Sequence, residues 1–135
     1  AVIQNQALTE KNYGTYTGKN KWQVKEEIGD EEFQKLRRAW DYPTPEGESM
    51  KDVYNRLIPY YQQEILPKLK VGKNVIISSH GNTLRTLVKF LENLSENEVA
   101  KLEFGLGEAY VYEIDSDGKI TGKEIRNKNV LAGKI

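Results

Sequence analysis

The 135-residue sequence contains no cysteine, which excludes disulfide bonds and thiolate metal sites. It also has no net charge, because 20 basic residues balance 20 acidic ones. No electrostatic attraction to nucleic acid or to a membrane surface is therefore expected. No apolar run approaches the roughly 20 residues that a membrane-spanning helix needs. We expect no nucleic-acid partner, no membrane span and a cytoplasmic location.

Histidine is nearly absent, since His80 is the only one in the chain. The length limits the protein to one domain with a core of moderate size. Eight tyrosines, two tryptophans and several short apolar runs argue against disorder.

Three segments carry helical signals in the first half of the chain. Apolar residues recur at helical spacing over residues 20–40, and Gly29 is expected to divide this stretch into two helices. Ser49, followed three residues later by Asp52, predicts the N-terminus of another helix. Pro59 predicts a kink or a break within that helix.

The second half combines strands with helices. The continuous apolar run at 74–79 predicts a strand buried on both faces, as in a parallel sheet. A helical pattern follows at 83–94, and Ser95 predicts the cap of one more short helix. Two β-rich segments around Asp117-Gly118 predict a hairpin. This alternation indicates an α/β fold.

His80 lies where the predicted strand ends and a helix begins, in the run "SSHGNTLR". Ligands bind at such junctions in α/β sheets, and a helix N-terminus offers free N–H groups to a phosphate. Asn82 and Thr83 add short polar side chains. The alternative is a plain helix cap whose histidine bonds a backbone carbonyl, and these residues alone do not decide between the two.

Two other segments bear on that choice. Residues 7–21, "ALTEKNYGTYTGKNK", place a glutamate, lysines and glycines in a loop-like stretch. Arg37 and Arg38 are adjacent, late in a predicted helix. Paired arginines are most often solvated surface charges, whereas two guanidinium groups that converge on one anion would form a binding site.

Taken together, these segments resemble the cofactor-dependent phosphoglycerate mutases of the histidine phosphatase superfamily. The resemblance extends from about residue 8 to residue 115, in the family's order. It rests on the runs "LTEKNYGTYTGKNK", "RRAWDYPTPEGES", "LIPYYQQEILPKLKVGKNVIISSHGNTLR" and "YVYEID". Lys21, Arg37 and Arg38 match the mutase pattern, whereas the histidine segment alone would fit the phosphatases as well.

The resemblance implies a role for each matching residue. Glu10 matches the general acid and base that moves a proton to or from the substrate hydroxyl. His80 matches the second histidine, which stabilises charge on the transferring phosphoryl group and is not the nucleophile. Further positions match residues that hold the phosphoglycerate: Tyr13, Lys21, Arg37, Arg38, Gly81 and Asn82.

One departure from the family pattern is important. The family's nucleophile is a histidine in an R-H-G motif near the N-terminus, and this sequence has no R-H-G. We therefore expect residues 1–135 to be the C-terminal portion of a single phosphoglycerate mutase-like domain. The implied fold is a three-layer sandwich, a mostly parallel sheet flanked by helices, without its N-terminal part. Unpaired strand edges would favour self-association, so a homo-oligomer is an open expectation.

The implied activity is interconversion of 2- and 3-phosphoglycerate in glycolysis and gluconeogenesis through a phosphohistidine. The small-molecule phosphoglycerate is the expected substrate, 2,3-bisphosphoglycerate the priming phosphoryl donor, and no metal is expected. This chain alone is expected to be inactive. Two alternatives stay open: a phosphatase of the same superfamily, and a non-catalytic relative that binds phosphorylated ligands.

Overall fold

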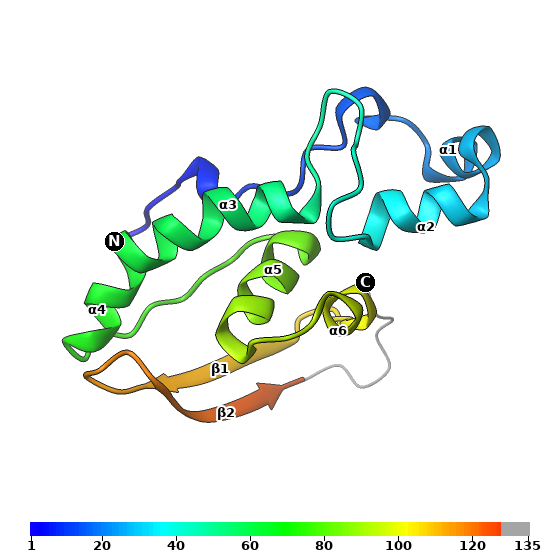
Figure 1. The fold of residues 1–135 in the computed structure, drawn as a ribbon. Helices are drawn as coiled ribbons and strands as arrows, with labels where there is room; N and C mark the ends of the chain where they lie inside the picture. Colours follow the sequence, from blue (N-terminus) through cyan, green and yellow to red (C-terminus); the bar gives the residue numbers. More distant parts are fainter. Residues whose placement is uncertain (128–135) are drawn as a thin grey trace.

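The computed structural model describes residues 1–127, in which the helices lie on one side of a two-stranded sheet (Figure 1). Two short 3-10 turns, η1 and η2, come first, and a π-helical turn, η3, joins α3 to α4. In chain order the elements are η1 (Gln6–Leu8), η2 (Gly14–Tyr16), α1 (Lys21–Ile28), α2 (Asp30–Arg38), α3 (Met50–Tyr60), η3 (Tyr61–Ile65), α4 (Leu66–Lys70), α5 (Gly81–Glu92), α6 (Glu96–Lys101), β1 (Ala109–Ile114) and β2 (Ile120–Arg126).

The main core forms where α3 and η3 pack against α5. Leu57 of α3 is fully buried and Leu87 of α5 is 6% exposed, and both belong to one apolar cluster. Phe90 of α5 meets Tyr54 and Tyr61 edge-on, with ring centroids 6.2 and 5.8 Å away. Each such buried side chain contributes roughly 1.5 to 3 kcal/mol. This contact fixes the position of α5, whose N-terminus carries the residues that follow His80.

The helix signals of the sequence are confirmed. Ser49 and Asp52 form a reciprocal capping box at the start of α3. Ser95 forms another at the start of α6. Gly29 separates α1 from α2 with a φ of 85°, a backbone conformation that side chains with a Cβ disfavour. Pro59 does not break α3, but the regular helix gives way to the π-helical turn two residues later.

A second, smaller core holds α1 against α2. It consists of Val24, Phe33 and Leu36, with Tyr13 and other half-buried residues packed around it. Figure 1 shows these two helices at the opposite end of the molecule from the turn of the hairpin. One wall of this small core is therefore the loop that carries Tyr13.

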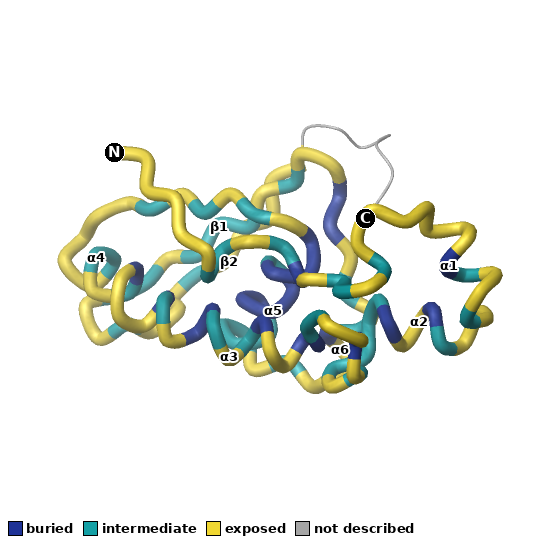
Figure 2. The backbone as a smooth tube through the Cα atoms, turned by 90° about the horizontal axis from the view of Figure 1, so that it is seen from above, coloured by how far each residue is buried: buried dark blue, intermediate teal, exposed yellow. Residues whose placement is uncertain are grey.

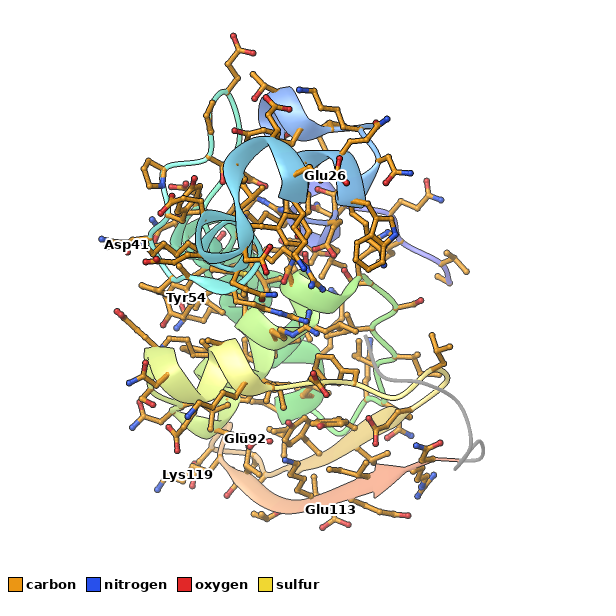
Figure 3. The ribbon with its side chains drawn as sticks, turned by 90° about the vertical axis from the view of Figure 1, so that its right-hand side faces the viewer. Glu26, Asp41, Tyr54, Glu92, Glu113 and Lys119 are labelled. Carbon is orange, nitrogen blue, oxygen red and sulfur yellow. The ribbon has the colours of Figure 1, made fainter. Side chains whose placement is uncertain are left out.

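The predicted hairpin is confirmed. β1 pairs with β2 in antiparallel register, and the Asp115 side chain accepts hydrogen bonds from the N–H groups of Asp117 and Lys119 in the turn. Glu92 of α5, labelled in Figure 3, accepts a hydrogen bond from the Tyr112 hydroxyl at 2.5 Å. This bond joins the sheet to α5. The fold thus mixes helices and sheet. Within residues 1–127 the sheet is this antiparallel pair, so the expected mostly parallel sheet is not confirmed.

The prediction of a strand buried on both faces at 74–79 is wrong. The segment forms no strand pairing within residues 1–127, and Ile76 is 95% exposed. Val75 and Ile77 do pack against the main core. Alternate side chains of an extended chain point to opposite sides, so only one face of this segment is covered. A continuous apolar run does not reveal which of its faces have neighbours.

Candidate active site

The carboxylate of Glu10 lies on the N-terminus of α5. The main-chain N–H groups of Asn82 and Thr83 each donate to it, both at 3.3 Å, and the N–H of Lys11 donates at 2.8 Å. The Thr83 hydroxyl, in turn, donates to the carbonyl of Thr9 at 2.6 Å. A helix N-terminus stabilises an anion through its free N–H groups and its dipole. In this structure Glu10 itself is that anion.

Asn82 connects Glu10 to a second functional group, the Tyr13 hydroxyl. The Asn82 side-chain amide donates to this hydroxyl at 2.8 Å, while its side-chain oxygen accepts from Arg85 at 3.3 Å. Burial raises the pKa of Tyr13, and the hydrogen bond from Asn82 opposes that rise. Tyr13 therefore stays a neutral phenol near pH 7, able to donate or accept a hydrogen bond.

Three arginines lie close enough to Glu10 or Tyr13 to act on them electrostatically: Arg37, Arg38 and Arg85. Burial, with repulsion from Arg37, lowers the pKa of Arg38. Burial and then the charge of Arg38 lower the pKa of Arg85 to about 10. Like charges are held together by the fold at a cost, and a bound anion would relieve that cost. Arg37 and Arg38 are both half-buried, so neither is a fully solvated surface charge.

A cavity of about 360 Å³ opens beside this cluster, between the loop that follows Glu10 and the helices α1 and α2. Tyr13, Lys21 and Arg37 line it, together with buried apolar residues of the small core. Lys21 is the first residue of α1, and its ammonium lies 5.3 Å from the centre of the exposed Trp22 ring. The predicted contacts Tyr13, Lys21 and Arg37 therefore line one cavity.

Lys11 is buried beside the same cavity, with only 3% of its surface exposed. Its ammonium donates to the carbonyl of Leu36 and lies 4.8 Å from the centre of the Tyr13 ring. Burial lowers its pKa to about 8, although Glu10 and Glu48 partly oppose that shift. A buried ammonium of this kind adds positive charge where the cavity meets the carboxylate.

The two remaining predicted residues are Gly81 and His80. Gly81 is the first residue of α5 and is buried. His80 is the N-cap residue, in extended conformation, and its side chain is exposed. Within residues 1–127 its imidazole forms no hydrogen bond, so the alternative of a capping histidine bonded to a carbonyl does not apply. The structure links Glu10 to Tyr13 through Asn82, which bonds both. His80 is exposed and precedes these residues of α5.

Sequence reasoning assigned no role to three buried or half-buried cations: Lys11, Arg56 and Arg85. Lys11 directly follows Glu10 in the run "LTEKNYGTYTGKNK". Arg85 ends the run "SSHGNTLR", three residues after Asn82. Arg56 forms an ion pair with Glu48, which lies eight residues earlier. This spacing matches no local sequence pattern that would predict the pair. The importance of Arg56 is visible only in the folded chain.

No group of three or more His, Cys, Asp or Glu side chains suited to a metal ion occurs in the described part, residues 1–127. Within the same residues, none of the helices combines the length and the apolar character required to cross a membrane.

Comparison with known proteins assigns the chain to a family. The family "Histidine phosphatase superfamily (branch 1)" matches residues 1–125. Proteins named 2,3-bisphosphoglycerate-dependent phosphoglycerate mutase are similar: one from Parvibaculum lavamentivorans is 42% identical over 124 residues, covering 92% of this chain and 59% of the relative. One from Methylorubrum extorquens is 39% identical over 129 residues, covering 96% and 61%, and one from Chlamydia pneumoniae is 46% identical over 112 residues, covering 83% and 49%. This chain spans about half to three fifths of these relatives. It belongs to branch 1 of the histidine phosphatase superfamily.

Proposed function

We propose that the protein containing this chain is a phosphoglycerate mutase, which interconverts 2- and 3-phosphoglycerate in the cytoplasm with 2,3-bisphosphoglycerate as priming phosphoryl donor. The relatives that carry this name support the proposal. We also propose that these residues form the C-terminal portion of one domain. A segment outside them would supply the phosphohistidine and complete a three-layer sandwich, a mostly parallel sheet flanked by helices.

The observation that carries the proposal is the seating of the Glu10 carboxylate on the N-terminus of α5, within electrostatic range of Lys11, Arg38 and Arg85. A phosphate and a carboxylate on the substrate need cations and hydroxyl donors, which Arg37, Arg38 and Tyr13 would provide. Moving a phosphoryl group onto a hydroxyl also requires a base for the proton, and Glu10 is the carboxylate beside these donors. A module that only binds phosphorylated ligands has no need of that carboxylate.

In the proposed reaction, phosphoryl groups pass between the histidine and the two hydroxyl oxygens of the glycerate in two transfers. The 2-hydroxyl oxygen of 3-phosphoglycerate attacks the phosphorus carried by the nucleophilic histidine, the P–N bond breaks, and its electron pair stays on the histidine ring. Glu10 takes the hydroxyl proton. When the 3-phosphoryl group returns to the histidine, the C3 oxygen leaves and Glu10 gives the proton back. Lys21, Gly81, Asn82 and His80 would bind the phosphoryl oxygens and stabilise their charge. The residues of the site fit an anionic primer, because they are predominantly cationic.

The test is mutase turnover in the complete protein, with formation of 2-phosphoglycerate coupled to enolase. We expect activity that depends on added 2,3-bisphosphoglycerate, and a fall in kcat of about 10²- to 10⁴-fold in Glu10→Gln. Glu26→Gln, which changes an exposed carboxylate on α1 (Figure 3), is the matched control and should retain full activity.

Three results would contradict parts of this proposal. Phosphate release faster than isomerisation would make the protein a phosphatase. Phosphoglycerate binding without either reaction would make it a binding protein. Mutase turnover by the isolated 135-residue chain, or phosphorylation of His80 in it, would overturn the assignment of the nucleophile to another segment. Sedimentation of the same samples would show whether the proposed homo-oligomer forms.

A further inference from the structure

Arg56, on α3, contacts the backbone of the loop that leads to Glu10. Its two terminal nitrogens donate to loop carbonyls over distances of 2.7 to 3.2 Å. The four carbonyl groups belong to Gln6, Ala7, Thr9 and Glu10. About 50 residues of sequence separate donor and acceptors, so these bonds fix the loop against the helix. An arginine can do this because its planar guanidinium presents five donors in a fixed geometry.

Glu48 fixes Arg56 from the other side. Its two oxygens accept from Arg56 Nε at 2.7 Å and from a terminal nitrogen at 3.1 Å, a paired geometry that orients the guanidinium. The same carboxylate accepts the N–H of Asn12 at 2.9 Å. Burial would raise the pKa of Glu48, but the hydrogen bonds from Arg56 and Asn12 hold it below its usual range. The pair thus stays charged. Arg56 bonds the loop before Glu10, and Glu48 bonds it after Glu10, at Asn12.

The backbones on this side approach too closely for most side chains. The Glu48 N–H donates to the Asn12 carbonyl at 2.7 Å, and a Cβ on the neighbouring Gly47 would lie 2.5 Å from that carbonyl oxygen. Gly14 has a φ of 55°, and a Cβ there would collide with the carbonyl of Pro45. The turn before α3 and the loop after Glu10 therefore form one interlocked unit with Arg56.

We propose that Arg56, oriented by Glu48, is a positioning residue that holds Glu10 where it can exchange a proton with the substrate. The loop is fixed on one side by α3 through Arg56 and on the other by α5 through Thr83. Each nitrogen of the guanidinium already donates within the protein, so Arg56 acts through Glu10 and not on the substrate. Its part in proton transfer rests on the proposed mutase function; its part in holding the loop does not.

The first experiment measures the loop itself in the complete protein. Arg56→Lys keeps the positive charge but cannot reach four carbonyls and a carboxylate at once. We expect backbone amide exchange at Lys11 and Thr83 to become about tenfold faster, because both N–H groups are bonded to the Glu10 carboxylate. Arg126→Lys, at an exposed site on β2, is the control and should change neither amide. Wild-type exchange at both amides in folded Arg56→Lys would overturn the proposal.

The second experiment measures the reaction in the complete protein. We expect Arg56→Lys to lower kcat about 10- to 100-fold, because a catalytic group displaced by about 1 Å loses up to 10²-fold, while KM stays within about threefold. The limb of the pH–rate profile that reports Glu10 should also move, which a merely structural residue would not cause. A raised KM with unchanged kcat would place Arg56 in substrate binding and overturn the proposal.

One outcome separates this proposal from the proposed function. If the wild-type protein shows no mutase turnover, the mutase function fails, and amide exchange alone then decides whether Arg56 holds the loop. If Arg56→Lys does not fold, as judged by its urea midpoint, Glu48→Gln replaces it. That variant keeps the shape of the side chain but weakens the charged pair, so the same two amides should exchange faster by a smaller factor.

Discussion

The residues on the two sides of His80 differ sharply in their surroundings. After it, the first residues of α5 are buried, including Thr83 and Thr86, which are 1% and 0% exposed (Figure 2). Before it, the extended segment 74–79 alternates between half-buried and exposed positions, with Ile76 exposed. The helix has neighbours on several sides, namely α3, α6 and the loop of Glu10. The extended segment is covered on one face only.

This difference shows what a sequence motif does and does not encode. "VIISSHGNTLR" is one continuous signal in the sequence, but its two halves depend on different parts of the fold. The helical half finds its partners within residues 1–127. The apolar half has the composition of an interior strand, and an interior strand needs lateral neighbours and two covered faces.

Leu87 and Ile76 lie on the two sides of His80 and differ in burial, so their truncation should have very different effects on stability. Leu87→Ala removes a buried side chain from the α3–α5 core and should lower the free energy of unfolding by about 2 to 5 kcal/mol. Ile76→Ala removes a side chain of similar size from an exposed position and should change it by less than about 0.5 kcal/mol. Urea denaturation of the 135-residue chain measures both. A large cost for Ile76→Ala would show that the exposed face is covered in solution.

Local signals were enough to predict the helices, and the physical reason is that their determinants are local. Ser49 with Asp52, Gly29 and the Asp117-Gly118 turn each act within a few residues of chain. The state of 74–79 could not be predicted, because burial depends on neighbours that no local pattern specifies.

The same limit applies to the candidate site. Glu10, Tyr13 and Asn82 could be named from family resemblance, and the structure brings them within hydrogen-bonding distance through contacts about 70 residues apart in sequence. Arg56 and the buried state of Lys11 could not be named. Both follow from how the loop of Glu10 lies against α2 and α3, which only the folded chain shows.

Lys11 is buried where the loop of Glu10 lies against α2, and its burial should make the stability depend on pH. Its pKa is about 8 in the folded chain and 10.5 as the ordinary value. Between these pH values the unfolded chain binds more protons, so the free energy of unfolding should rise with pH across that window, by roughly 3 kcal/mol in total. Below pH 8 the full cost of burying the ammonium is present.

Lys11→Met removes the titrating group, so its free energy of unfolding should lack this rise between pH 8 and 10.5. Lys51→Met, at an exposed position of α3, is the control and should keep the wild-type dependence. Urea midpoints taken at half-unit pH steps give the comparison. Parallel curves for Lys11→Met and the wild type would show that the Lys11 ammonium is solvated, and that the loop does not close over it.

One of the contacts between the loop and α5 is the hydrogen bond from the Thr83 hydroxyl to the Thr9 carbonyl, and its loss should have a small effect on stability. Thr83→Val keeps the shape of the side chain but loses the donor to the Thr9 carbonyl, so the free energy of unfolding should fall by about 1 kcal/mol. The loss is limited because Arg56 also donates to that carbonyl. Thr86→Val is the matched control: within residues 1–127 its hydroxyl bonds only the Asn82 carbonyl, one turn earlier in the same helix, and its cost should be smaller. Equal costs for the two variants would mean that the hydroxyl of Thr83 does not hold the loop.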